Sequence, residues 1–343
     1  MVGHKGVPCL RWLIAALVVT TATVGGAAAQ QQNRFTVLEE NDSLFFNSDK
    51  HYTQGLRLSN LFPPVAPGTG WNAPFDFVDS FVPWAFPQGG RREYSFLLGQ
   101  SIFTPKNTQI KPPDPRDRPY AGWLYGGLSL LQESGGRSLE NLEIDFGVVG
   151  PPALGRQVQN DFHQFIGESA SEGWSSQIQT ELGGMVSYER LWRIPLLGNN
   201  GFGVDIVPQA GVTAGNIFTY ADVGGMVRIG RGLDADYGPA RVRPALSGTD
   251  YFNADGLDEG TGFYFFAGTQ GRAVGHNIFL EGNTFRTGRS VPKKTLVGDV
   301  QAGFSWMWNR NWRADISVVL RSPEFQGQHG PDDICTAALT FSW

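Results

Sequence analysis

Polar residues of types that can do chemistry gather in the first half of the chain. They form four short segments: Glu40-Asn41-Asp42, Tyr52-Thr53-Gln54-Gly55, Asp117 to Trp123, and a stretch from Gly150-Pro151 through His163 to Glu181. A carboxylate with neighbouring oxygens suits a hard cation, which takes carboxylate, carbonyl and water oxygens. A histidine can draw a proton from an attacking water near neutral pH. The residues alone therefore indicate a metal-assisted hydrolytic site that uses a histidine.

Each segment also has an ordinary structural explanation when it is taken alone. Asn-Asp at a strand end is common turn chemistry, and Tyr-Thr-x-Gly is ordinary strand sequence with a glycine bend. Asp-Arg-Pro-Tyr can form a local ion pair, and a single histidine is more often structural than catalytic. The case for a site rests on the four segments together.

The elements that must hold these residues are strands, because two-residue alternation is the main pattern in the chain. In residues 142–148, Leu142, Ile144, Phe146 and Val148 share one face, while Glu143, Asp145 and Gly147 share the other. Residues 300–308 and 312–321 alternate in the same way. A long strand with a charged residue at every second position requires one wet face.

Other strands are expected near 34–40, 52–62, 93–103, 120–133, 184–194, 202–214, 218–229, 262–270, 275–284 and 333–343. Their number and length predict an all-β fold, a transmembrane antiparallel β-barrel of about 12 strands. Residues 156–168 are expected to form a short helix. Connections at 63–90 and 104–119 are rich in Pro and Gly, as is typical of loops on the outer side of a barrel. Aromatic residues at strand ends fit an interfacial girdle; they are Trp123, Tyr125, Trp306, Trp308 and Trp312.

The two ends of the chain favour export to a membrane. Residues 1–29 have a positive start, an apolar stretch and Ala27-Ala28-Ala29 before Gln30, which predicts a cleaved signal peptide. The barrel domain would then span residues 30–343. The final strand alternates and stops on the aromatic Trp343, which resembles the assembly signal of bacterial outer-membrane proteins. A soluble β-sandwich or lipocalin-like barrel would alternate too, but it explains these ends less well.

The charge, hydropathy and cysteine content of the chain limit the kinds of partner and fold that it can have. The net charge is −5, so nothing indicates a nucleic-acid partner. The mean hydropathy of −0.21 suits a transmembrane barrel, in which lipid-facing and lumen-facing residues alternate. Cys9 falls in the signal peptide, so Cys335 is left as a small packing residue.

Taken in order, the polar motifs resemble those of one family, the lipid A 3′-O-deacylases (LpxR-like). The motifs that carry the resemblance lie within residues 35–185 and are Asn41-Asp42, Tyr52-Thr53-x-Gly55, Thr104-Pro105, Asp117-Arg118-Pro119-Tyr120-Ala121-Gly122-Trp123, Gly147-Val148-Val149-Gly150-Pro151, Gln159-x-x-x-His163 and Gly173-Trp174-x-x-Gln177. Beyond that stretch the likeness is one of strand pattern and length.

The resemblance implies a calcium-dependent outer-membrane hydrolase that removes the 3′-linked acyloxyacyl chain of lipid A. It implies His163 as the general base and Asp42 as a ligand of Ca²⁺, which would polarise the ester carbonyl. Asn41 would orient His163 or donate to the oxyanion, and Thr53 would hold the water or a metal ligand. The implied partners are lipopolysaccharide and outer-membrane lipids, and the protein is expected to be a monomer.

The chain departs from the family pattern just after the histidine. Some family members have a functional Glu at the position that Ser169 occupies here, with Glu168 one residue earlier. Glu168 and Glu181 are therefore the candidates for the supporting carboxylate.

Two other functions stay open at this stage. One is an outer-membrane phospholipase with a serine nucleophile, for which the serine-rich residues 169–176 follow His163 closely, although no Gly-x-Ser-x-Gly elbow occurs. The other is a non-enzymatic barrel, either a channel or a structural protein.

Overall fold

The structure is a computed structural model that describes residues 32–42, 50–199, 201–242, 249–257 and 260–343. Antiparallel strands dominate it: β1 (Arg34–Asn41), β2 (His51–Leu61), β3 (Arg91–Thr104), β4 (Ala121–Ser134), β5 (Ser138–Val149), β6 (Glu181–Trp192), β7 (Ile194–Asn199), β8 (Phe202–Gly215), β9 (Phe218–Arg231), β10 (Gly262–Asn277), β11 (Leu296–Trp308), β12 (Trp312–Arg321) and β13 (Asp332–Ser342). Among the described residues, three α-helices lie in the connections: α3 (Ala73–Phe81), α4 (Gly155–Ile166) and α5 (Ile278–Glu281). The proposed signal peptide, residues 1–29, falls outside the described residues.

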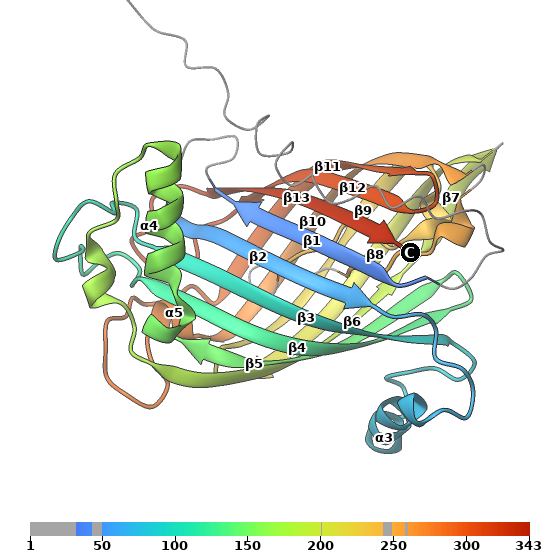
Figure 1. Ribbon diagram of the computed structural model, residues 1–343, viewed down its shortest axis with the longest axis horizontal. Helices are drawn as coiled ribbons and strands as arrows, with labels where there is room; N and C mark the ends of the chain where they lie inside the picture. The colour runs from blue at the N-terminus through green and yellow to red at the C-terminus, as the bar shows by residue number, and fades with distance from the viewer. Residues whose placement is uncertain (1–31, 43–49, 200, 243–248, 258–259) are drawn as a thin grey trace, which may run out of the picture.

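The sheet closes into a barrel (Figure 1). The first strand pairs with the last, from Arg34 opposite Ser342 to Asn41 opposite Cys335. On the other side β6 pairs with β8, and β7 continues the line of β6 along the same partner. Because β6 and β7 together make one staggered strand, the described chain builds a wall of twelve strands. The prediction of a barrel with about 12 strands is therefore confirmed.

The prediction of a separate strand at residues 275–284 is wrong. Residues 275–277 are the end of the long strand β10, and α5 follows directly. The side chain of Asn277 accepts a hydrogen bond from the backbone N–H of Phe279 at 3.0 Å, as a helix N-cap does. The cap turns the chain away from the wall, which the apolar pattern around Ile278 does not indicate.

Alternation separates a lipid-facing surface from a polar interior. In β5, Ile144 and Phe146 are 44% and 64% exposed, whereas the intervening Glu143 and Asp145 are buried. Large exposed apolar residues recur in the same alternation on β3, β6, β9, β11 and β12. This pattern places the apolar face outside, in contact with lipid.

The interior of the barrel is packed with side chains and with part of the β9–β10 connection. Arg57 pairs with Glu143 at 3.1 Å, and its guanidinium also donates to the backbone carbonyl of Arg241 at 3.1 Å. The backbone N–H of Val242 donates to Glu40 on β1 at 3.1 Å. The connection therefore enters the barrel and is held there by charged groups on the inner wall.

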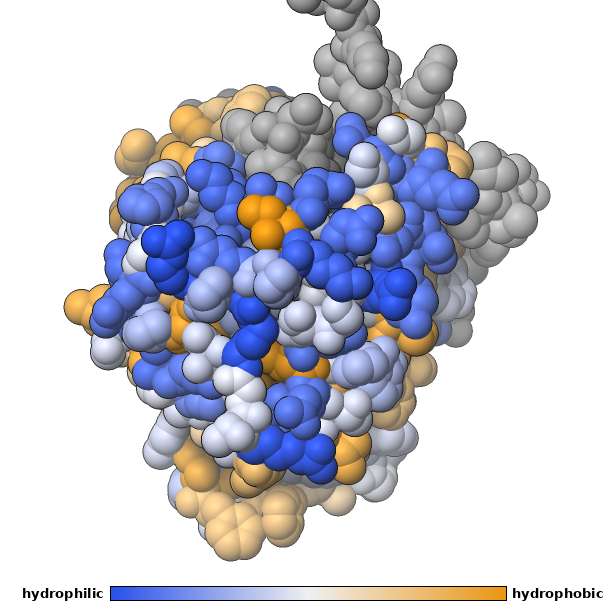
Figure 2. All heavy atoms as spheres, turned by 90° about the vertical axis from the view of Figure 1, so that its left-hand side faces the viewer, coloured by the Kyte–Doolittle hydropathy of each residue, from blue (hydrophilic) through white to orange (hydrophobic). Residues whose placement is uncertain are grey.

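The two ends of the barrel differ. Residues 105–120, 150–180, 282–295 and 322–331 form long loops at the end where α4 lies, and Figure 2 shows this end as largely hydrophilic. Outer-membrane barrels carry long loops outside the cell and short turns on the periplasmic side. The opposite end holds both chain ends of the barrel, the connections 62–90 and 232–261, and the short turns 135–137 and 309–311; these short turns mark it as the periplasmic end.

Both Pro- and Gly-rich connections were expected on the outer side of the barrel, and this prediction is wrong for residues 63–90. These residues lie at the periplasmic end, because successive connections of an antiparallel barrel alternate between its two ends. Residues 104–119 lie at the extracellular end as expected. Within the described ranges, no helix combines the length and apolar character needed to cross a bilayer.

The expected aromatic girdle is partly correct. Trp306 is 51% exposed, and a series of ring contacts, tilted or stacked, continues from it through Trp308 and Trp312 to Phe341 and Trp343. Trp123 and Tyr125, however, are buried inside the barrel, with ring centroids 5.4 Å apart. The facing glycines leave the space for them: a Cβ on Gly99 would lie 2.3 Å from the Tyr125 ring.

Candidate active site

Helix α4 presents a buried stripe at intervals of four residues. The expected helix at 156–168 forms as Gly155–Ile166, and its buried residues are Gly155, Gln159 and His163. Residues four apart lie on one helix face. The spacing Gln-x-x-x-His therefore directs both polar side chains toward whatever α4 packs on.

Helix α4 packs on the outside of the barrel wall, where β3 ends and β4 begins. Ile102, on the outward face of β3, is completely buried and clusters with Tyr120 and Trp174. The indole N–H of Trp174 donates to Gln159 on α4 at 2.7 Å. Figure 1 shows α4 crossing this end of the wall. His163 is therefore held beside the lipid-facing surface and not in the barrel interior.

His163 is fixed in one tautomer by its contact with the following loop. Its Nδ1 lies 2.8 Å from the backbone carbonyl oxygen of Ser169. A carbonyl can only accept a hydrogen bond, so Nδ1 carries the proton, and Nε2 is the basic nitrogen of the neutral ring. Ser169 thus orients the histidine through its backbone.

Asn41 and Thr53 lie on the same outward surface, on two neighbouring strands. Glu40 points into the barrel, so the alternation turns Asn41 outward, where it faces Gln54 across the β1–β2 ladder. A bulge in β2 between Tyr52 and Gln54 accommodates Thr53. The Thr53 hydroxyl lies 2.7 Å from the hydroxyl of Thr104, which shares a face of β3 with Ile102.

Asp42 follows β1 directly and is buried, with an exposed fraction of 2%. Its carboxylate accepts a hydrogen bond of 2.5 Å from the backbone N–H of Lys50. This contact ties the two ends of the β1–β2 connection together and holds the carboxylate next to Asn41. Residues 43–49 lie outside the described chain.

The two candidate glutamates occupy different places. Glu168 follows the α4 C-terminus, and its backbone N–H donates to the carbonyl of His163 at 2.8 Å while its side chain is exposed. Glu181 begins β6 and accepts hydrogen bonds from Asn216 at 3.0 Å, from Asn283 at 3.2 Å and from the backbone of Thr284 at 3.0 Å. These contacts give Glu181 a role in joining three segments at the rim.

Comparison with known proteins decides the family. The family model described as "Outer membrane protein LpxR" matches residues 12–343. The chain belongs to the LpxR family. Among solved structures, LpxR from Salmonella typhimurium is 21% identical, with a TM-score of 0.69 over 90% of this chain and 99% of that one. At this identity the likeness shows a shared fold.

Other barrels are less similar to this LpxR family member. The β domain of the Bordetella autotransporter BrkA is 9% identical, with a TM-score of 0.41 over 91% of this chain and 98% of that one. The translocator domain of NalP from Neisseria meningitidis is 7% identical, with a TM-score of 0.38 over 97% and 93%. No curated protein sequence matches the chain. Family and fold place the protein in the outer membrane.

The donor types beside Asp42 fit calcium better than a transition metal. Within the described ranges, no group of three or more His, Cys, Asp or Glu side chains could hold a metal ion. The end of β1 and the start of β2 instead offer a carboxylate, an amide oxygen and a hydroxyl oxygen, from Asp42, Asn41 and Thr53. Ca²⁺ accepts such neutral oxygens together with carbonyls and water, whereas zinc sites use nitrogen and sulfur ligands more heavily.

Three contacts near these residues were not expected from the sequence. Thr104 supports Thr53, Gln159 anchors the loop through Trp174, and His51 lies with Nδ1 2.6 Å from the carboxylate of Asp332. Gln159 already stands in the motif Gln-x-x-x-His, but the motif does not indicate its hydrogen bond to Trp174. Nothing local could have identified Asp332, because it joins His51 only through closure of the barrel.

Proposed function

We propose that the protein is a calcium-dependent hydrolase that removes the 3′-linked acyloxyacyl chain from lipid A, with His163 as the general base. Membership of the LpxR family supports an outer-membrane lipid A deacylase. The calcium requirement, the base and the position of the cleaved ester are the parts proposed here.

One observation carries the proposal: α4, which bears His163, packs on the outward face of the wall at the extracellular end, and Asn41 and Thr53 lie on that same face. Polar groups on the lipid side of a barrel wall are costly in free energy, so their presence there indicates a functional site. Lipid A occupies the outer leaflet, so its acyl esters can reach this surface sideways from the membrane. A substrate of the barrel interior would require the reacting groups to face inward.

The described contacts suit the proposed roles. With Nδ1 donating to Ser169, Nε2 of His163 is the nitrogen able to take a proton from a water that attacks the ester carbonyl. Bound Ca²⁺, held by Asp42, would supply positive charge to polarise that carbonyl. Asn41 can donate from its amide to the developing oxyanion or orient the histidine, and the Thr53 hydroxyl can hold the water.

The phospholipase alternative lacks support at its most specific point. The hydrogen bond from His163 goes to the backbone carbonyl of Ser169 and not to its hydroxyl. A serine nucleophile would need its hydroxyl within hydrogen-bond reach of the basic nitrogen. The contact therefore gives no support to Ser169 as the nucleophile.

The test is mass spectrometry of lipid A after incubation with the purified protein in detergent micelles. We expect loss of the 3′ acyloxyacyl mass with calcium, no loss after chelation, and recovery when calcium is returned. A phospholipid in parallel reactions should stay intact. Lipid A that stays unchanged with calcium present would refute the proposal, and release of fatty acid from the phospholipid alone would establish the phospholipase.

A further inference from the structure

The β2–β3 connection, residues 62–90, folds back on the outside of the barrel at the periplasmic end. The ring of Trp71 stacks on Tyr94 of β3 with centroids 4.1 Å apart, and Tyr188 of β6 donates its hydroxyl to the carbonyl of Ala85 at 2.8 Å. Tyr94 and Tyr188 both occupy outward positions of their strands. The connection and its helix α3 therefore lie on the lipid side of the wall, as Figure 1 shows.

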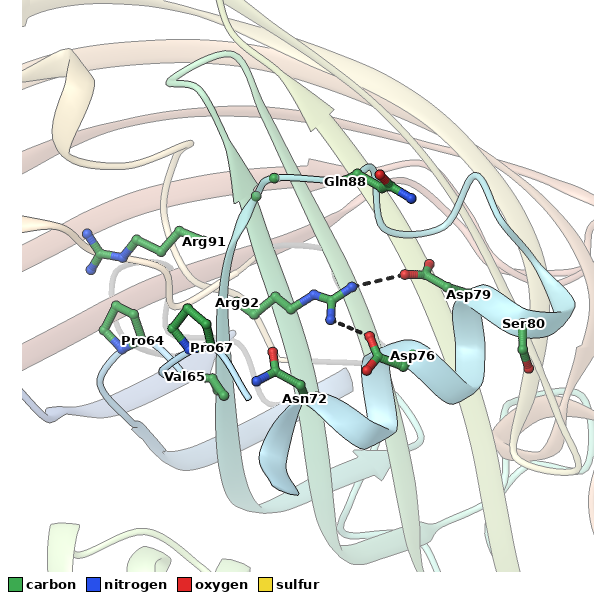
Figure 3. A pocket seen from close by; sticks show the side chains of 12 residues that line it. Pro64, Val65, Pro67, Asn72, Asp76, Asp79, Ser80, Gln88, Arg91 and Arg92 are labelled. Atoms are coloured by element: carbon green, nitrogen blue, oxygen red, sulfur yellow. Dashed lines mark hydrogen bonds and ion pairs between the residues drawn. The ribbon is translucent and has the colours of Figure 1, made fainter. Parts of the chain in front are cut away.

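The rotation of α3 about its own axis is fixed by two further contacts. Arg92 of β3 reaches Asp76 at 2.6 Å and Asp79 at 3.0 Å, side chains one turn apart on the helix (Figure 3). Phe75 is buried against Phe86 and the outward residue Leu130. One face of α3 is thus held by charge and another by apolar packing.

The remaining face of α3 and the residues after it expose aromatic rings. Phe77 and Phe81 are 67% and 73% exposed and contact each other, with centroids 5.1 Å apart. Trp84 is 62% exposed although its ring lies against Tyr188 at 5.4 Å. We call Phe77, Phe81 and Trp84 the aromatic patch.

We propose that the aromatic patch inserts into the phospholipid surface at the periplasmic side of the membrane and that α3 lies in the plane of that surface. The patch is continuous with the lipid-facing wall, because the ring of Trp84 contacts the outward Tyr188 of β6. Beside the patch, Trp71 stacks on the outward Tyr94 of β3. A helix with aromatic residues on one face and charges on another is suited to a membrane interface, where aromatic rings are enriched. The patch extends the aromatic girdle beyond the strands.

The test places a fluorophore at single positions of the full protein folded into phosphatidylcholine vesicles. An environment-sensitive label is attached at Phe81→Cys and, as the matched control, at Ser80→Cys on the polar face of the same helix. Nitroxide-bearing phosphatidylcholine then serves as the quencher. We expect at least about a twofold loss of emission at position 81 and a clearly smaller loss at position 80, as for a helix lying in the interface.

A second pair of variants covers the possibility that labelling disturbs α3. The charged double variant F77E/F81E should lose protection of residues 62–90 from protease in vesicles, whereas F77L/F81L should keep it. Equal, weak quenching at positions 80 and 81 would overturn the proposal. Emission at position 81 that changes with protein density but not with quencher lipid would assign the patch to a second copy of the chain and would also overturn it.

Discussion

A histidine acts as a base through the ring nitrogen that carries no proton in the neutral ring, and a single backbone contact determines which nitrogen this is in His163. The carbonyl oxygen of Ser169 accepts a hydrogen bond from Nδ1, and the two atoms lie 2.8 Å apart. A neutral acceptor fixes the tautomer without adding charge beside the ring. The orientation of His163 therefore depends on the shape of the loop after α4.

Side-chain changes at the two positions after the helix should consequently have little effect. We expect Ser169→Ala and Glu168→Ala each to keep deacylation within about twofold of the parent rate, because the hydrogen bond uses the backbone and the Glu168 side chain is exposed. Initial rates on lipid A at saturating calcium provide the measurement. A loss in Glu168→Ala as large as that from removing His163 would restore Glu168 as the supporting carboxylate.

At this scale the sequence identified side chains but not their backbone partners. The ordered motifs indicated Asn41, Asp42, Thr53 and His163, and the fold brings Asn41 and Thr53 to one outward surface. The sequence could not indicate the role of the Ser169 carbonyl, because every residue has a backbone carbonyl. Asp332 lies 281 residues from His51, so only barrel closure could bring them together.

Among the helices and strands, α4 has the largest effect on the candidate site, because it bears His163 and its packing on the wall positions that side chain. The approach is close: a Cβ on Gly155 would lie 2.7 Å from the Trp174 ring and 3.4 Å from Gly122. Trp174 is itself fixed by its hydrogen bond to Gln159. The glycine at the helix start is thus required by packing and not by backbone conformation.

Adding a methyl group at this point should displace α4 while leaving the barrel folded. We expect Gly155→Ala to destabilise the docked helix by about 1–3 kcal/mol, the usual cost of overpacking, and to lower activity several-fold. Gly271→Ala on β10 is the matched control, because a Cβ there meets nothing within 4 Å. Activity assays are paired with the heat-dependent gel shift of the folded barrel. Equal activity in the two variants would show that α4 docking does not limit the reaction.

The sequence predicted the elements better than their positions. Alternation predicted most wall strands, and the residues of α4 were expected at 156–168. That α4 would lie outside the wall depends on contacts between Gly155, Gly122 and Trp174, which are distant in sequence. The placement of Trp123 and Tyr125 failed because a period of two sorts residues into faces without saying which face is inside.

Considered as a whole, the molecule is a filled barrel with its candidate site on the outside. Arg228 bridges Asp205 and Asp236, each at 2.5 Å, and Arg313 reaches Asp236 at 3.3 Å. With the β9–β10 connection, these ion pairs occupy the space that a porin would leave to water. The monomeric state and cleavage of residues 1–29 stay predictions.

A filled interior predicts little ion flow. We expect the protein to show no stable open state in a planar lipid bilayer, since its inner side chains are buried and paired. A porin of known conductance, inserted under the same conditions, serves as the control. Regular, voltage-independent openings in most insertions would contradict this expectation and favour the channel hypothesis.

The proposed deacylation is tested most directly by the rate at which the His163→Ala variant releases the 3′ acyloxyacyl chain from lipid A. His329→Ala is the control, because His329 is an exposed histidine at the same end of the barrel. If His163 is the general base, the rate of release should fall about 10²- to 10⁴-fold in His163→Ala, the usual contribution of such a base. The rate of His329→Ala should equal that of the parent protein. Parental release by a folded His163→Ala variant would contradict the proposed role of His163.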